Sequence, residues 1–203
     1  MLKTNGSVAE VLAMYDASVQ SFDSASSGYN NTYAGNNIDT YCNVTFYGSL
    51  SSTMKSAIID KTFMQDSWVR SSSTVPTTPH YTGKYKPKAY YLTLSNAMFG
   101  ESITRHCYVL SVQDILDYLD ASTSMGISDT TLTDVAVWEM IWNKTSSLGS
   151  VFSWLRSAYN TDSIVSFSVY GYYGFLDVVR VDAKKSVRPA FQIDLSKIEW
   201  TKQ

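Results

Sequence analysis

Aromatic and hydroxylated side chains gather near the C-terminal end of the chain, in a spacing typical of a binding surface. Eight aromatic residues lie within residues 152–175. The stretch 170–175 reads YGYYGF, and its two glycines predict a turn. Exposed tyrosine beside serine, asparagine and aspartate contacts ligands through its ring and through adaptable hydrogen bonds. We therefore predict a binding surface here. The alternative is a tyrosine-rich turn that packs on its own domain.

Histidine, cysteine and acidic residues form no recognisable metal site in the sequence. His80 and His106 are the only histidines, and no CxxC pair offers zinc ligands. Asp114, Asp117 and Asp120 recur every third residue, which places them near one face of a predicted helix. We interpret this run as a solvated helix face, with calcium binding as the alternative. The sequence therefore predicts no metal ion and no cofactor.

Nucleophilic catalysis finds no support in the sequence. It contains no G-x-S-x-G motif and no glycine-rich phosphate loop. His106 and Cys107 are neighbours, but adjacent residues on a strand point to opposite faces, which argues against a Cys–His pair. Aspartates are frequent, yet nothing singles out a carboxylate pair for glycoside hydrolysis. We therefore expect no catalytic residues and no enzymatic activity.

The two cysteines, Cys42 and Cys107, are too few for a disulfide framework. We expect two half-buried free thiols. One disulfide is the alternative in an oxidising compartment, and the Cα separation that would decide between them cannot be obtained from the sequence.

The overall composition describes a globular chain that binds neither nucleic acid nor the membrane interior. Its 203 residues are 44% hydrophobic and 14% aromatic, which is enough for the core of one domain. Charged residues make up only 17% and the net charge is -2, which argues against a clustered basic surface for phosphates. There is no run of about 18 apolar residues that could span a membrane. The first residues also lack the apolar segment of a signal peptide.

Short helices and strands must position these residues. Helical signals predict helices at 37–43, 51–60, 111–119 and 133–141, with Asn37, Ser51 or Ser52, and Ser111 as N-terminal caps. Apolar alternation or short apolar runs predict strands at 61–70, 107–110, 151–156, 164–170, 176–181 and 187–193. Residues 7–17 fit a helix or a strand, while 21–37 and 71–88 are typical of loops. The prediction is an α+β fold, with helices in the first two-thirds and a compact antiparallel sheet in the last third.

Several stretches resemble a domain of formerly unknown function that is common in surface proteins of gut bacteria. They are residues 33–47, 57–68, 108–118, 153–157 and 186–198, and the most specific are SWLRS at 153–157 and VRPAF at 187–191. Cys42 departs from the pattern, because an apolar residue is expected there. The ending also resembles modules of the C-type-lectin fold, including relatives of the formylglycine-generating enzyme. The cysteine pair that does that enzyme's chemistry near its C-terminus has no counterpart here, so its activity is not carried over.

The resemblance implies one C-type-lectin-like domain over residues 1–203, with a sheet at 151–193. Trp154, Leu155, Ala190 and Phe191 would lie in its core. Arg156 and Arg188 would make charge-assisted hydrogen bonds to loop carbonyls or a carboxylate, in a structural role.

The same fold occurs in variable proteins diversified by retroelements, in which adenine-containing codons near the C-terminus are randomised. Nearly every residue between the two fixed motifs here is an outcome of such randomisation. The resemblance therefore implies a ligand-binding surface made of Tyr159, Asp162, Ser163, Ser166, Ser168, Tyr170, Tyr172, Tyr173, Phe175, Leu176 and Asp177. Its ligand would be a protein or a glycan on another cell. The chain itself would lie at the cell surface, be secreted or belong to a phage particle. The alternatives are a structural module of a larger surface protein and an enzyme with an unrecognised site.

Overall fold

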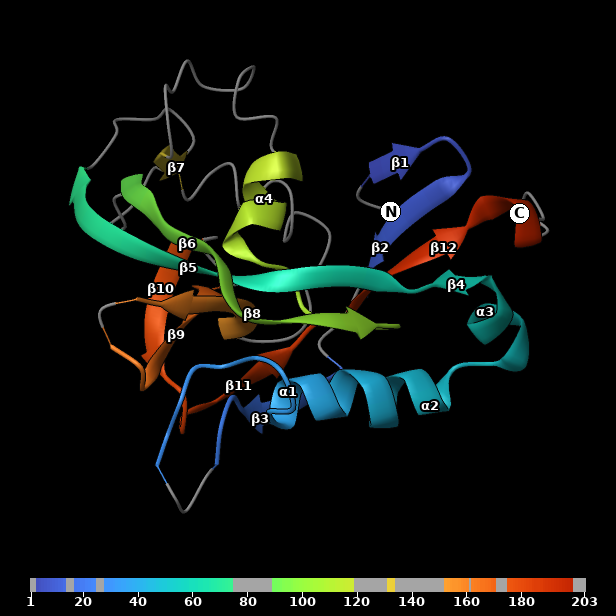
Figure 1. The fold of residues 1–203 in the computed structure, drawn as a ribbon, viewed down its shortest axis with the longest axis horizontal. Coiled ribbons are helices and arrows are strands. Elements are labelled where there is room, and N and C mark those ends of the chain that lie inside the picture. The colour runs from blue at the N-terminus through green and yellow to red at the C-terminus, as the bar shows by residue number, and fades with distance from the viewer. Residues whose placement is uncertain are drawn as a thin grey trace, which may run out of the picture.

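The chain forms a mixed α+β structure with short helices and mostly β-sheet, as predicted (Figure 1). The computed structural model describes residues 3–13, 17–24, 28–74, 89–118, 131–133, 152–160, 162–170 and 175–198. Within these residues, no helix has both the length and the apolar character needed to cross a membrane.

A small antiparallel sheet joins the two ends of the chain. Its strands follow the order β1 (Lys3–Asn5), β2 (Val8–Leu12), β12 (Ala190–Asp194) and β4 (Ile58–Ile59). Gly6, with φ of 60°, lies in the turn between the first two strands, where a residue without a Cβ atom avoids strain. The segment that fitted either a helix or a strand thus contains a strand, because β12 supplies hydrogen-bonding partners for it.

The larger sheet is mixed, and it extends well beyond the predicted last third. Its strands follow the order β10 (Phe175–Arg180), β9 (Val165–Tyr170), β8 (Phe152–Tyr159), β5 (Lys61–Thr74), β6 (Ala89–Arg105) and β7 (Thr131–Thr133). Strand β8 runs parallel to β5 and to β11 (Lys184–Val187), which pairs with β3 (Ser18–Ser21). The predicted antiparallel sheet of the last third is thus confirmed for β8, β9 and β10, but β8 also has two parallel neighbours and β12 belongs to the small sheet. The loop prediction for residues 71–74 was wrong, because they belong to β5.

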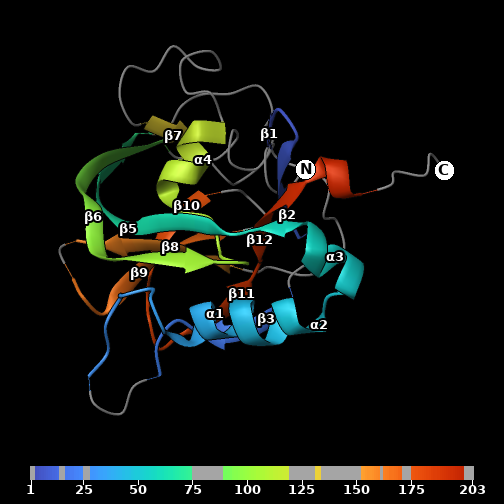
Figure 2. The ribbon, with the colours of Figure 1, turned by 45° about the vertical axis from the view of Figure 1, so that its right-hand side comes forward.

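Two helical layers lie on opposite sides of β5 and β8 (Figures 1 and 2). One is a continuous helix made of α1 (Asn37–Thr40), a π-helical segment (Tyr41–Phe46) and α2 (Tyr47–Ser49). The other is α4 (Val112–Tyr118). Among the described residues, the remaining helices are α3 (Ser52–Ala57) and a 3₁₀ turn (Leu195–Lys197).

Two of the predicted helix caps are confirmed. The Ser51 Oγ accepts a hydrogen bond from Met54 N at 3.2 Å. The Ser111 Oγ accepts from Asp114 N at 2.9 Å, while an Asp114 carboxylate oxygen accepts from Ser111 N at 3.0 Å, which is a reciprocal capping box. The first helix is capped by Asn36, one residue before the predicted Asn37. Residues 134–141 of the fourth predicted helix lie outside the described residues.

The core contains the predicted motif residues. Trp154, Leu155, Ala190 and Phe191 are all buried, as expected, together with Tyr108. The two cysteines are free thiols, but both are fully buried rather than half-buried.

Candidate functional site

The connection between β8 and β9 combines a firmly held backbone with exposed side chains. Asn31 is buried, and its Nδ2 donates hydrogen bonds to the carbonyl oxygens of Tyr159 at 3.1 Å, Asp162 at 3.2 Å and Val165 at 2.8 Å. The amide has only two hydrogens, so the three carbonyls share them. The turn is therefore held by three hydrogen bonds from a side chain outside it and by one from Ile164 N to Asp162 Oδ1 at 3.0 Å, while the Asp162 and Ser163 side chains remain exposed to solvent.

The loop that contains Tyr29 and Asn30 packs beside this turn. The Asn30 backbone N–H donates to a carboxylate oxygen of Asp23 at 2.9 Å, and Asp23 N–H donates to the carbonyl of Val181 at 3.0 Å. The Arg180 guanidinium lies 6.0 Å from the centre of the Tyr29 ring. The loop is thus tied to the end of β10 on one side and, through the neighbouring Asn31, to the β8–β9 turn on the other.

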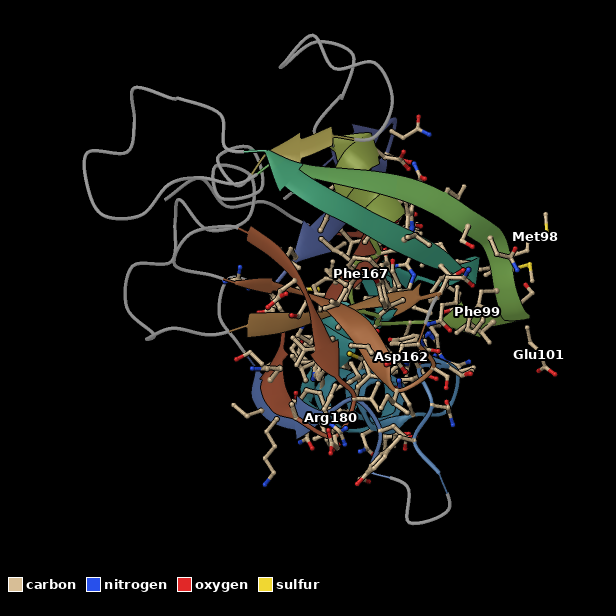
Figure 3. The ribbon with its side chains drawn as sticks, turned by 90° about the vertical axis from the view of Figure 1, so that its left-hand side faces the viewer. Met98, Phe99, Glu101, Asp162, Phe167 and Arg180 are labelled. Carbon is tan, nitrogen blue, oxygen red and sulfur yellow. The ribbon has the colours of Figure 1, made fainter. Side chains whose placement is uncertain are left out.

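The exposed residues on these loops form what we term the loop-end surface. Asp162 and Arg180, both labelled in Figure 3, lie at the ends of neighbouring strands. The fixed backbone thus presents five kinds of group: a carboxylate, a hydroxyl, an amide, a guanidinium and a phenol ring. The members of the surface are Tyr29, Asn30, Asp162, Ser163 and Arg180.

Three of these residues were not predicted from the sequence. Tyr29 and Asn30 lie in the predicted loop 21–37, whose asparagine and glycine content indicated only a turn-rich segment. Arg180 lies at the end of a predicted strand. Since Asn31 lies 128 residues before Tyr159, no local pattern could place the two loops together.

Two of the other predicted binding residues are half-buried. Tyr159 is half-buried, and its ring packs edge-on against Phe167 at a centroid distance of 5.8 Å. Asp177 is half-buried, and its Oδ1 accepts from Val178 N at 2.8 Å.

The structure gives only the backbone of the next predicted residues. Tyr170 pairs with Phe175, and Leu176 pairs with Val169, where β9 meets β10. Tyr172 and Tyr173 lie outside the described residues.

Ser166 and Ser168 correct the prediction, because both are fully buried. The Ser166 Oγ donates to the carbonyl of Ser157 at 2.8 Å. Alternation along β9 suggested one apolar inner face and one polar outer face. Instead, both faces of β9 are covered at these positions, because Ser166, Phe167 and Ser168 are all fully buried, and Ser168 lies directly opposite the buried Trp154 of β8. These serines cannot belong to an outward-facing surface in this structure.

A buried ionic cluster lies within the fold and joins β2, β5, α4 and β8. The Lys61 Nζ is 3.0 Å from Glu10 Oε1 and 3.2 Å from Asp114 Oδ1. The Arg156 Nη1 lies 2.5 Å from Asp114 Oδ2 and donates to the Val109 carbonyl at 2.7 Å. Arg156 thus contacts both a carboxylate and a loop carbonyl, as the resemblance implied. Asp114 was predicted to be solvated, and burial between two cations corrects that prediction.

The charges of the cluster favour a structural role over proton donation. Burial would raise the pKa of Asp114, but the charges of Arg156 and Lys61 outweigh it and lower this pKa to about 2. The carboxylate is therefore ionised at neutral pH. The Tyr108 hydroxyl donates to Glu10, so the second carboxylate also has a fixed partner.

Acid is expected to weaken the fold through Asp114. A carboxyl whose pKa is lowered on folding from 3.8 to about 2 stabilises the folded state above pH ~4, and this contribution is lost as the pH falls through about 2. The full loss should be about 2 kcal/mol, most of it reached by pH 2.5. Urea denaturation at pH 6, 4 and 2.5 would measure it. The Asp114→Asn variant should be less stable at pH 6 and should lose less on acidification, and an equal acid loss in both proteins would contradict the assignment.

Among the described residues, no group of three or more histidine, cysteine or acidic side chains is placed to hold a metal ion.

A family model described as a domain of unknown function, DUF6273, matches residues 9–195. No curated protein matches the chain. No solved structure matches it either.

Proposed function

The chain belongs to the DUF6273 family, and we propose that this member is a non-enzymatic binding module that recognises a protein or glycan ligand on another cell. The loop-end surface would contact the ligand, together with the predicted residues around 170–177. The tyrosine rings would supply contact area, while the carboxylates, amides and hydroxyls would supply hydrogen bonds.

The hydrogen bonds of Asn31 are the observation that carries the proposal. A surface that is ordered before its ligand arrives loses less conformational entropy on binding. Because Asn31 fixes the backbone of the β8–β9 turn from outside, Ser163 can be presented, or replaced, without loss of a turn contact, while Asp162 also accepts a hydrogen bond from Ile164 N within the turn. A scaffold that tolerates variable side chains needs this separation between frame and display: the residues that hold the backbone must differ from the residues that contact the ligand.

The finer identity of the fold is part of the proposal. We propose a single C-type-lectin-like domain of a bacterial surface, secreted or phage protein, whose frame is held by the SWLRS and VRPAF motifs. The burial of Trp154, Arg156 and Arg188 supports their role in the frame. Diversification by a retroelement would act on the segment between the motifs, with the buried Ser166 and Ser168 outside the binding surface.

Binding can be tested with a labelled chain on a printed glycan array and on a phage-displayed random peptide library. The double variant Asp162→Ala, Ser163→Ala should lower any specific signal about tenfold or more. The matched control is Glu101→Ala, Ser102→Ala, another exposed acid–serine pair, on β6 (Figure 3). Specific signals from neither probe, or equal losses in both double variants, would overturn the proposal.

The genetic part of the proposal has its own test. A retroelement-diversified gene should lie near a reverse transcriptase gene and near a copy of the coding segment for residues 154–191 that differs only at adenines. A gene neighbourhood without such a copy would exclude diversification and leave the binding proposal intact.

A further inference from the structure

The two thiols of the chain lie in neighbouring segments of one buried cluster. Cys42 belongs to the π-helical segment, and Cys107 follows the end of β6. Asn43, the next residue after Cys42, clamps the second cysteine: its Oδ1 accepts from Cys107 N at 3.2 Å, and its Nδ2 donates to the Cys107 carbonyl at 2.8 Å. Both thiols are fully buried in the same hydrophobic core.

A second contact holds the same two segments together. The Arg105 guanidinium donates to both carboxylate oxygens of Asp39, at 2.7 and 2.6 Å. Bidentate pairs of this kind fix orientation as well as distance. The helix and the end of β6 are therefore held together by Asp39 before Cys42 and by Asn43 after it.

The folded environment protects the thiols from reaction. Burial raises the pKa of Cys107 to about 12, and burial together with the charge of Cys107 raises that of Cys42 well above its usual range. Since thiolates are the reactive species and neither sulfur reaches solvent, exchange in the folded state should be very slow. The thiols become accessible only before the core closes.

We propose that Cys42 and Cys107 form a disulfide when the chain folds with a disulfide oxidant present, and remain two protected thiols when it folds under reducing conditions. One thiolate attacks oxidised glutathione and releases reduced glutathione. The second thiolate then displaces the other glutathione from the mixed disulfide. The two thiols lose two protons and two electrons, which the glutathione disulfide takes up. The proposal does not depend on ligand binding.

Refolding the reduced, denatured full chain tests this directly. One sample refolds with oxidised and reduced glutathione, the other with dithiothreitol, and both are then unfolded and alkylated with iodoacetamide. Intact mass should show no alkyl groups in the first sample and two in the second. The oxidised form should also melt about 10 °C higher, because the bridge closes a long loop. Two alkyl groups in both samples, or a retained glutathione, would overturn the proposal.

Two further measurements test whether the effect needs both cysteines and whether the disulfide forms only during folding. The Cys42→Ala and Cys107→Ala variants should melt at the same temperature after either refolding. If either variant fails to fold, the alkylation result on the natural chain still decides the question. Adding oxidised glutathione to the chain already folded with reduced thiols should leave two alkylatable thiols after hours, and rapid oxidation would contradict protection by the fold.

Discussion

Replacing Arg156 with methionine is expected to lower the free energy of unfolding by about 3–5 kcal/mol. Arg156 is buried, and its guanidinium neutralises Asp114 while also donating to the Val109 carbonyl. Methionine can keep much of the packing against Phe63, whose ring centre lies 4.3 Å from the guanidinium carbon. Among the described residues, however, it leaves Asp114 with Lys61 alone as a charged partner. Urea denaturation at pH 7 would measure the loss.

Arg180→Met is the matched control, because Arg180 also pairs with an aspartate, Asp182, but on the surface. Exposed ion pairs contribute little, so this variant should show no clear change in the urea midpoint. The double variant Arg156→Met, Asp114→Leu should lose less than the sum of its two single variants, because it leaves no uncompensated charge. Additive losses, or equal effects of Arg156→Met and Arg180→Met, would refute the anchoring role.

Local signals in the sequence predicted the caps and strands that depend only on local chemistry. Ser51 and Ser111 cap their helices because a hydroxyl near a free N–H needs no distant partner. The strands at 164–170 and 176–181 were predicted for a similar reason, since hairpin strands pair with their chain neighbours. The parallel pairing of β8 with β5 joins segments about ninety residues apart, and no periodicity in either segment encodes it.

Within the candidate site, the sequence predicted solvent exposure correctly only for residues that lie in a turn. Asp162 and Ser163 were predicted correctly to be exposed, because they lie in the connection between two strands. The prediction that Ser166 and Ser168 lie on an exposed binding surface was wrong, because alternation indicates two faces of a strand without showing which neighbours cover them. Asp114 shows the same limit on a helix: spacing put it on one face with Asp117, but only the tertiary structure brings Arg156 and Lys61 to that face.

Trp154 carries the second large effect, and Trp154→Ala is expected to cost about 3–5 kcal/mol of folding free energy. Its ring is almost fully buried and packs edge-on against Phe22 at a centroid distance of 5.3 Å. Its Nε1 donates to the carbonyl of Gln20 at 2.9 Å, which ties β8 to β3. Alanine would leave a large cavity and remove the donor for that carbonyl. Chemical denaturation followed by circular dichroism would measure the loss.

Two comparisons separate the cavity from the lost hydrogen bond. Trp154→Phe keeps a ring but no donor, so it should lose less than the alanine variant and mainly reduce hydrogen-exchange protection in β3. Met98→Ala removes a large side chain that is 67% exposed and should change stability by no more than about 0.5 kcal/mol. If Trp154→Ala were as mild as Met98→Ala, the SWLRS motif would not hold the frame, and the separation between frame and display that underlies the binding proposal would fail with it.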